Sequence, residues 1–269
     1  MKKNVTGRQL ARVSAIDHQE TIWSEVFPGN QHTVNCLPDA LKGVQSSLEL
    51  DEKQRRRTVW RMDGGGGSDA NFRLLLQQGY QLHAKGLSSS RAAVLAKKVS
   101  RWDAYADIWL GEVEPTFDLG RPVRVFIQRR RKKEQFLHNY FVSTLKLPSK
   151  MHFLAHYNDR GGAETEQFRE DKSGLAMAIR RKRSLNGQKG YILLTDLAHN
   201  LLADFKHHAL SGSRFEGYGI KRIVRDLLCM PGMLVFDDQK LVRIELLSQK
   251  QNAADLLICL ERYCFTRFS

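Results

Sequence analysis

A strand-like segment that ends in an aspartate and runs directly into four glycines constrains the fold of this sequence more than any other feature. Residues 58–62 combine β-branched, aromatic and apolar side chains, which predicts a strand, and Asp63 follows at once. Ser68 or Asp69 can then cap a helix predicted over residues 69–78. A carboxylate at a strand end, beside backbone without side chains, suits a metal or phosphate site. Four consecutive glycines more often mark a flexible turn, so the assignment of a site depends on partner residues elsewhere.

The chain is strongly basic. It has 43 Lys and Arg residues against 29 Asp and Glu, which gives a formal net charge of +14. The basic residues cluster in three runs, at residues 55–57, 129–133 and 180–183. Any one run could be a solvated loop or hairpin tip. Three runs with no compensating acidic tract predict a polyanionic partner, most simply nucleic acid.

Length and composition allow one elaborated domain or two small ones, because 269 residues, 42% of them hydrophobic, can bury at least one large core. No apolar stretch approaches the length of a membrane span, and the N-terminal residues lack the apolar run of a secretory signal. We therefore expect a soluble, cytoplasmic protein without a membrane partner. The four cysteines show no metal-ligand spacing with histidines and are expected to be buried and reduced.

The first part of the chain reads as strand, strand, helix, strand, helix. Residues 9–16 and 20–27 predict a hairpin, and residues 35–50 carry apolar side chains at helical spacing ahead of the strand that ends in Asp63. From residue 81 to about 147 the character changes. A helix is expected over 88–102, followed by strands at 123–127 and 139–145 that flank the basic run.

The last part of the chain returns to helices. Residues 157–172 and 191–205 are both predicted to be helical, and a late hairpin (233–236 with 241–246) precedes a terminal helix over 253–265. The second helix repeats apolar residues on one face, which predicts that this face packs in a core. These residues are Leu194, Leu197, Ala198, Leu201 and Phe205.

The helix over 157–172 carries a second candidate constellation. Tyr157, Arg160, Glu164 and Lys172 fall on successive turns of it, together with other charged residues. Such a face can hold a metal and a phosphate together. A solvent-exposed face with salt bridges between residues four apart would use this density of Glu, Arg and Lys equally well.

These residues resemble the DDE transposases of bacterial insertion elements, in the branch whose catalytic core is interrupted by a strand-rich insertion before the catalytic Glu. Asp63 and the glycine-rich turn are similar to the family's second catalytic Asp. The four residues of the second constellation are similar to its Tyr-Arg-Glu-Lys signature. Further similarities are spread along the chain, at Gly79-Tyr80, Ala84-Lys85-Gly86, Arg91-Ala92 and Thr195 to Asn200.

The resemblance implies a fold and a division into domains. The fold would be α/β, with a ribonuclease H-like mixed sheet and a β-rich insertion before the catalytic Glu. Residues 7–85 and 150–269 would form the catalytic core, and residues 86–149 the strand-rich insertion with a basic tip. The first core strand, which carries the first catalytic Asp in this family, has no counterpart in the sequence, so an N-terminally truncated chain is expected.

The resemblance also implies a chemistry, namely transposition of a mobile element by metal-dependent DNA cleavage and strand transfer. Asp63 and Glu164 would be catalytic and would hold Mg²⁺, with Mn²⁺ able to substitute. Tyr157, Arg160 and Lys172 would contact the DNA backbone near the scissile phosphate. The implied partners are double-stranded DNA, as element ends and as target, and a homodimer partner or a full-length transposase.

The basic run provides a further DNA contact that does not depend on the resemblance. Salt-sensitive binding with little sequence preference is expected from its five side chains. They are Arg129, Arg130, Arg131, Lys132 and Lys133.

The sequence departs from the family pattern at two of its motifs. Lys172 comes one residue late from Glu164, which leaves open a shifted register in which Glu166 is the functional carboxylate. Gly66 replaces the aromatic residue that is often found in the turn.

The absent first Asp leaves two alternative functions open. The chain could be a catalytically dead DNA-binding remnant, or a structure-selective nuclease in which Asp17 or another acidic residue completes the site. Asp17, in the turn of the first hairpin, is a poor substitute for a carboxylate on a strand. A site without the bridging carboxylate would hold at best one weakly bound ion, so this chain alone is expected to be inactive.

Overall fold

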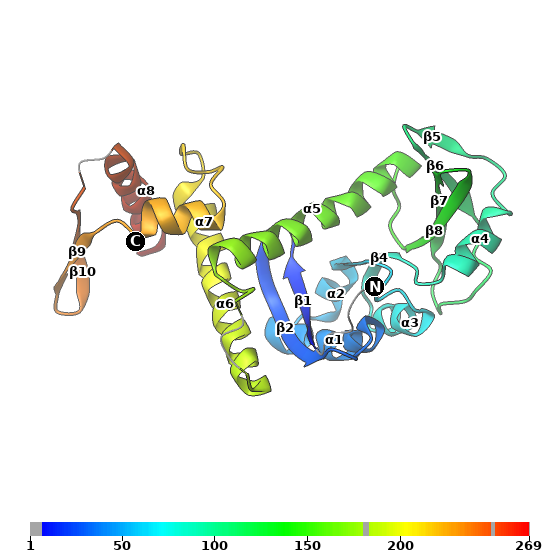
Figure 1. Ribbon diagram of the computed structural model, residues 1–269, viewed down its shortest axis with the longest axis horizontal. Coiled ribbons are helices and arrows are strands. Elements are labelled where there is room, and N and C mark those ends of the chain that lie inside the picture. Colours follow the sequence, from blue (N-terminus) through cyan, green and yellow to red (C-terminus); the bar gives the residue numbers. More distant parts are fainter. Residues whose placement is uncertain (1–6, 180–182, 249–250, 269) are drawn as a thin grey trace. The chain divides into compact units, whose positions relative to one another are not determined.

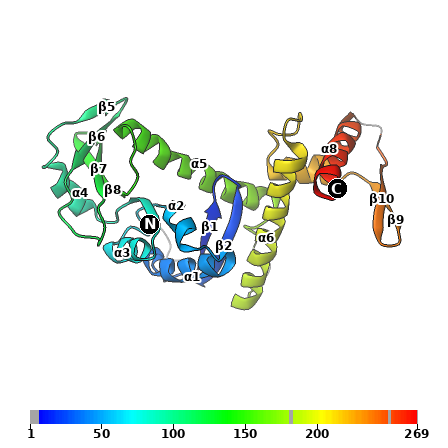
Figure 2. The same cartoon turned by 180° about the vertical axis from the view of Figure 1, so that it is seen from behind.

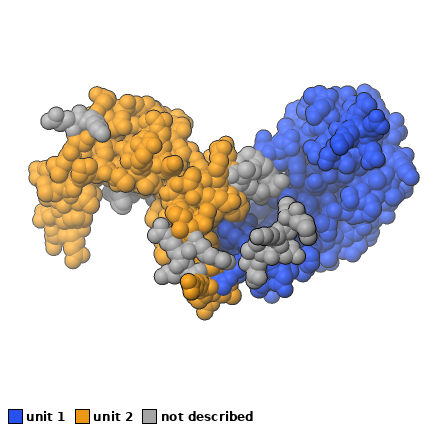
Figure 3. Space-filling model, viewed as in Figure 1, with its two compact units in different colours: residues 1–13, 22–162 blue, residues 14–21, 163–269 orange. Residues whose placement is uncertain are grey.

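A computed structural model of the protein describes residues 7–179, 183–248 and 251–268, with side chains described except at 160–165 and 265–268. The fold is mixed α/β, with a six-stranded sheet of parallel and antiparallel strands, as expected for the coarse fold class (Figure 1). The chain divides into two compact units (Figure 3). Unit 1 comprises residues 1–13 and 22–162, and unit 2 comprises residues 14–21 and 163–269.

The sheet of unit 1 places the strand before Asp63 at its edge. Its order is β3-β4-β8-β7-β6-β5. Strands β3 and β4 are parallel, and every later pair in this order is antiparallel. The bounds are β3 Val59–Met62, β4 Gln81–Lys85, β5 Asp103–Tyr105, β6 Ile108–Val113, β7 Arg124–Lys132 and β8 Gln135–Ser143.

The sheet joins the predicted core to the predicted insertion. Strands β5 to β8 come from residues 86–149, and β4 of the predicted core pairs directly with β8. The chain passes from unit 1 to unit 2 between residues 162 and 163, within α5 (Lys150–Gly174). The basic run lies within β7 and the turn after it, because β7 and β8 extend beyond the two strands expected around it.

Helices cover this sheet. They are α1 (Leu37–Leu48), α2 (Glu52–Arg57), α3 (Asp69–Gln77), α4 (Ser89–Ala96) and the first half of α5 (Lys150–Gly174), with a 3-10 turn at Thr33–Cys36 before α1. Helices α1 and α3 contact each other, as Figure 1 and Figure 2 show from opposite sides. Ser68 caps α3 by accepting a hydrogen bond from the Asn71 N–H at 3.2 Å, and Gly79, with φ of 91°, closes the helix.

Helix α2 was not expected, because it has no buried side chain and therefore no apolar periodicity. Its N-terminus is fixed by a capping box. The Asp51 carboxylate accepts from the Gln54 N–H at 2.7 Å, and the Gln54 side chain accepts from the Asp51 N–H at 2.8 Å. Its three arginines lie in the last turn, where positive charge is favourable to the helix dipole.

The predicted first hairpin is confirmed. Strands β1 (Arg8–Ala15) and β2 (Glu20–Pro28) form a separate two-stranded sheet. The part of this hairpin that belongs to unit 1 packs on α1, where the Trp23 ring lies so close to Gly43 that no Cβ would fit there. Val13, Ile22 and Trp23 pack against the main core of the unit.

Unit 2 is a helical cluster with a small ribbon. It contains the second half of α5, α6 (Leu185–Phe205), a π-helical turn at Lys206–Leu210, α7 (Ile220–Ile223), a second π-helical turn at Val224–Leu228, and α8 (Gln251–Phe268). Strands β9 (Gly232–Asp237) and β10 (Lys240–Leu246) form the predicted late hairpin. The core of this unit includes Leu210, Phe215, Ile223 and Leu256.

The prediction for the buried face of α6 is wrong for its three leucines, whereas Phe205 packs against the core of unit 2 as predicted. Leu194, Leu197 and Leu201 are 67%, 57% and 62% exposed. The buried side chains of this helix are Thr195, Asp196, His199 and Leu202. The helix therefore turns a largely polar face inward.

Hydrogen bonds to the first hairpin and to Asp171 of α5 explain why α6 buries its polar face. His199 Nε2 lies 2.7 Å from the Gln19 carbonyl oxygen, and His199 Nδ1 lies 2.7 Å from Asp171 Oδ1. The Asn200 amide accepts from the Thr21 N–H and donates to the Thr21 carbonyl, both at 2.8 Å. Polar side chains can be buried when such partners satisfy them, and the apolar stripe is then left outside.

Two smaller expectations were also tested. Cys36 and Cys259 are buried, but Cys229 is exposed and Cys264 is half-buried, so the expectation of four buried thiols is wrong. None of the helices in the described part of the chain combines the length and apolarity that a membrane-spanning segment needs.

Candidate functional site

Asp63 lies where the sequence places it, directly after β3, and its side chain is exposed. Because β3 and β4 are parallel, the turn after β3 and the end of β4 meet at the same edge of the sheet. Asp63 Oδ1 accepts a hydrogen bond from the Gly65 N–H at 2.9 Å. This contact holds the carboxylate over the turn.

The four glycines form an ordered turn with a packing role. The carbonyl of Gly66 accepts from Ser68 N at 3.0 Å and from Asn71 Nδ2 at 2.9 Å, and the Gly67 carbonyl accepts from Leu87 N at 2.9 Å. At Gly67 an added Cβ would collide with the Lys85 carbonyl oxygen. The turn therefore packs directly against the backbone that follows β4, which a larger residue at position 67 would prevent.

A cation lies beside this turn. A Cβ at Gly64 would be 3.7 Å from both Cδ and Cε of Lys85, so the Lys85 side chain runs along the first glycine. The turn thus presents an exposed carboxylate next to a lysine stem at the end of two parallel strands. This arrangement suits an anionic ligand that is bound together with a cation.

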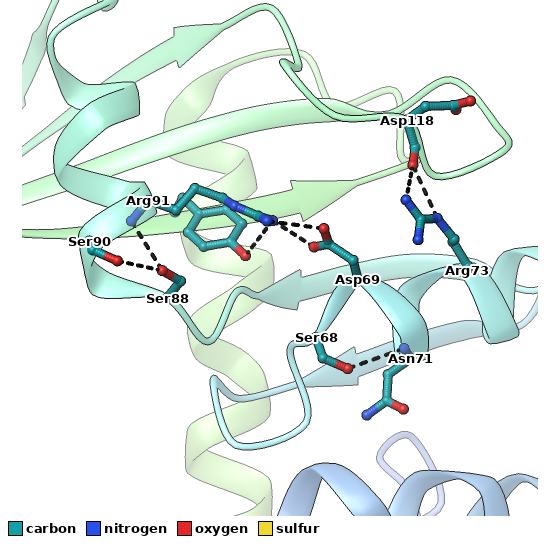
Figure 4. A network of polar contacts seen from close by, with 9 residues as sticks. Ser68, Asp69, Asn71, Arg73, Ser88, Ser90, Arg91 and Asp118 are labelled. Carbon is teal, nitrogen blue, oxygen red and sulfur yellow. Dashed lines mark hydrogen bonds and ion pairs between the residues drawn. The ribbon is translucent and has the colours of Figure 1, made fainter.

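An ion pair fastens the helix after the turn to α4 (Figure 4). Arg91 donates to both carboxylate oxygens of Asp69, at 2.6 and 3.0 Å, and to the Tyr140 hydroxyl at 3.3 Å. Its guanidinium also stacks over the rings of Phe117 at 4.9 Å and Tyr140 at 5.7 Å. The hydrogen bond to Asp69 raises the pKa of Arg91. Asp69 is thereby used for positioning, and Ser68 provides the cap.

We expect Arg91→Ala to destabilise unit 1 by about 1–2 kcal/mol, because it removes the bidentate ion pair and two ring contacts from a partly exposed site. Arg91→Lys keeps the charge without the planar fork and should lose less. Urea unfolding followed by circular dichroism measures both. Equal stability of the parent and Arg91→Ala would show that the pair does not hold the turn.

The basic run forms the tip of the β7–β8 hairpin. Arg130, Arg131, Lys132 and Lys133 are exposed. Arg130, Arg131 and Lys132 stand at the end of β7 and Lys133 in the turn after it, and Glu134 is the acidic residue that follows the run. This surface can contact phosphates along a nucleic-acid backbone.

Arg129 has different surroundings from the other four. Its guanidinium lies over the rings of Trp102 at 4.2 Å, Phe136 at 4.9 Å and Trp109 at 5.4 Å. Its Nε is buried without a hydrogen-bond partner. Arg129 is therefore held in an aromatic enclosure at the base of the tip, and the four residues beyond it carry the exposed charge.

Tyr157 lies in the core of unit 1. It is 9% exposed, and its ring packs against Phe141 at 4.8 Å and His83 at 6.0 Å. His83, on β4, is fully buried, with Nδ1 2.9 Å from Ser143 Oγ and Nε2 3.2 Å from the Phe153 carbonyl oxygen. The contact of Tyr157 with DNA stays a prediction, and its ring packs this helix onto the sheet.

His83 should make the protein less stable in acid. Burial, and next the charge of His156, lower the pKa of His83 to about 4 from 6.5. The unfolded chain then binds the proton more tightly than the folded one. The contribution of neutral His83 to the free energy of unfolding is therefore fully present above about pH 6.5 and is lost as the pH falls towards 4. The total loss is about 3 kcal/mol. Urea unfolding at pH 7 and pH 4.5 measures the loss. A His83→Gln variant should show a smaller loss over the same range, and an identical loss would exclude His83 as the cause.

The remaining predicted residues belong mostly to unit 2. The side chains of Arg160 and Glu164 lie outside the described residues. Glu166 is exposed and pairs with Arg169 at 3.6 Å, and Lys172 is exposed with Nζ 6.0 Å from the Phe168 ring. Since Asp63 belongs to unit 1 and Glu164 to unit 2, their shared metal site stays a prediction.

Within the described residues, no group of three His, Cys, Asp or Glu side chains gathers to hold a metal ion. Asp17 is exposed in the β1–β2 turn, as expected, and belongs to unit 2.

Sequence reasoning missed two polar pairs, the partly exposed pair of Asp69 with Arg91 and the buried pair of Asp171 with His199. The sequence gives little signal for either pair, because the partners lie 22 and 28 residues apart. The available hints were the motif positions of Arg91 and of His199. In comparisons with known proteins, no protein-family model matches the chain and no curated protein is significantly similar to it.

Proposed function

We propose that the chain carries the catalytic core of a DDE-type transposase of a bacterial insertion element, which cuts and joins DNA at element ends once a third carboxylate completes the site of Asp63 and Glu164. The observation that carries this proposal is the exposed carboxylate of Asp63 in a glycine turn at the end of two parallel strands. The packing of Gly67 against the Lys85 carbonyl supports it, since the turn is a built feature and not a loose connection.

The order of elements supports a ribonuclease H-like core. The hairpin of β1 and β2, helix α1 and strand β3 precede Asp63, and helix α3 follows it. The family pattern has the same order around its second catalytic Asp. Among the described residues, the outer edge of β3 pairs with no strand, and β1 and β2 form a sheet of their own. The proposal places the strand with the first catalytic Asp at this edge of β3.

The proposed metal is Mg²⁺, held by Asp63 and Glu164. Oxygen ligands of this kind suit Mg²⁺, and bound Mg²⁺ would supply charge stabilisation at the scissile phosphate. Asp63 uses Oδ1 to accept from the Gly65 N–H, which orients the carboxylate while oxygen lone pairs remain for a ligand. The ammonium group of Lys85, whose side chain runs beside the turn, would add positive charge near the DNA phosphate.

The exposed basic tip favours a second candidate, a DNA-binding module that performs no chemistry. Arg130, Arg131, Lys132 and Lys133 would bind the DNA backbone with or without an active site. In either case the partner is duplex DNA.

Metal-dependent nicking and joining separate these functions. The substrate is a plasmid that carries the DNA flanking this gene, incubated with the chain and Mg²⁺ or Mn²⁺. A transposase nicks and joins once a fused strand supplies the third carboxylate, a nuclease on the same fold nicks without joining, and a binding module does neither even with that strand. Retention of nicking in Asp63→Ala would reject Asp63 as the catalytic carboxylate.

A further inference from the structure

The ribbon of β9 and β10 exposes many apolar side chains for its size. They are 44% to 66% exposed and comprise Met233, Leu234, Phe236, Leu241, Val242 and Leu247. Leu246 packs against the core of unit 2 at one end of the ribbon, but a two-stranded ribbon is only marginally stable by itself. An apolar surface of this kind marks an interaction site.

The charge of this ribbon does not suit DNA. It carries Asp237, Asp238 and Glu245 against Lys240 and Arg243, which is three negative and two positive charges, or −1. The whole chain carries +14. The ribbon is therefore the wrong surface for a polyanion, and a protein partner fits it better.

The outer edge of β10 is available for pairing. In the described residues β10 pairs with β9 alone. Leu247 donates its N–H to the Pro231 carbonyl at 2.8 Å, on the β9 side. Because hydrogen-bonding groups alternate along an antiparallel strand, the backbone groups of Ile244 and Leu246 point to the outer edge.

We propose that this edge pairs with the same edge of a second copy of the chain, antiparallel and centred on Ile244. The sequence of β10 is complementary to itself in this register. Ile244 faces Ile244 of the second copy, Val242 faces Leu246, and Leu241 faces Leu247. Apolar residues meet apolar residues at each of these positions.

The charged residues match in the same register. Arg243 of each copy faces Glu245 of the other, which places one opposite-charge pair on each side of the centre. Within one chain Arg243 Nε already lies 2.8 Å from Glu245 Oε1. Pairing would therefore join two such ion pairs into one alternating group of four charges.

The register shift in β10 limits how far this pairing extends. It lies between Leu241 and Arg243, near the tip of the ribbon. A bulge of this kind twists a strand and hinders pairing along it. The outer pairs, Val242–Leu246 and Leu241–Leu247, lie across this shift, whereas the segment from Arg243 to Glu245 contains the centre and both charge pairs and needs no regular strand beyond the bulge.

Charge reversal tests the register directly with the full chain. The parent should sediment as a dimer, about twice 30.9 kDa, at micromolar concentration. R243E and E245R each place like charges opposite each other, so the dimer dissociation constant of each should rise on the order of tenfold or more. An equal mixture of the two variants pairs acidic with basic positions across the interface and should form a heterodimer near the parental affinity.

The mixture also separates this interface from the contact inside one chain. Both variants lose the internal Arg243–Glu245 pair, and mixing cannot restore it, so recovery reports pairing between chains. A fluorescent label on one variant identifies the heterodimer, and circular dichroism confirms that each variant is folded. A parent that is monomeric throughout, a dimer that neither variant weakens, or a mixture that fails to recover would each overturn the proposal.

Discussion

The isolated chain, given Mg²⁺ or Mn²⁺ and element-end DNA, should show neither end cleavage nor strand transfer above background. Chemistry of this type needs two ions placed together, and the family holds them with three carboxylates. Asp63 and Glu164 provide two of them in this proposal. Fusing to the chain a strand whose Asp supplies the third carboxylate should produce both activities, and adding Asp63→Ala to the fused chain should abolish them.

Cleavage by the unmodified chain that disappears in Asp63→Ala would refute this expectation. A further loss in Asp17→Ala would show that the β1–β2 turn provides the third carboxylate. His18→Ala, in the same exposed turn, is the matched control for damage to the hairpin.

Neutralising the four exposed residues of the basic tip should remove most of the salt dependence of DNA binding. Each phosphate contact contributes about 0.9 to the slope of log affinity against log salt, so replacing Arg130, Arg131, Lys132 and Lys133 by Gln should lower the slope by roughly 3 to 4. Fluorescence anisotropy with unrelated duplexes at several salt concentrations measures the slope and the lack of sequence preference.

Two comparisons sharpen this result. K132Q/K133Q should lower the slope by about 2, whereas K97Q/K98Q, an equally exposed pair of adjacent lysines, should leave it nearly unchanged. Arg129→Gln should reduce stability more than it changes the slope, because three aromatic rings enclose that guanidinium. An unchanged affinity and slope in the fourfold variant would exclude the tip as the contact surface.

The elements with a strong local pattern could be predicted from the sequence. The first hairpin, the strand before Asp63, the helix after it and the late hairpin all lie within a few residues of their predicted positions. Alternating and periodic apolar residues decide such elements locally. The position of Asp63 at the end of β3 follows from the same local signals.

The buried face of α6 could not be predicted in the same way. Its leucines form the more apolar face, but His199 and Asn200 find hydrogen-bond partners that lie far away in the sequence or on another element. Periodicity shows which face is apolar and does not show where such partners lie. Arg129 differs from its neighbours for a related reason, since its aromatic enclosure comes from β6, β8 and the segment before β5.

The glycine turn shows both the strength and the limit of the sequence pattern. Four glycines indicate a turn, but they do not distinguish a flexible turn from a packed one. That distinction depends on the close approach of Gly67 to the Lys85 carbonyl, which is a contact between the turn after β3 and the end of β4.

Metal-directed cleavage of the protein backbone tests most directly whether Asp63 and Glu164 share a metal site. Iron(II) at millimolar concentration, with ascorbate and hydrogen peroxide, cuts the chain beside the ion, and the fragments are mapped by mass spectrometry. The account predicts cuts near both residue 63 and residue 164, which excess Mg²⁺ suppresses and Asp63→Ala removes. Loss of the cuts in Glu166→Gln but not in Glu164→Gln would move the assignment to Glu166. Cuts at only one of the two segments, or cuts that Asp63→Ala leaves unchanged, would contradict a shared site.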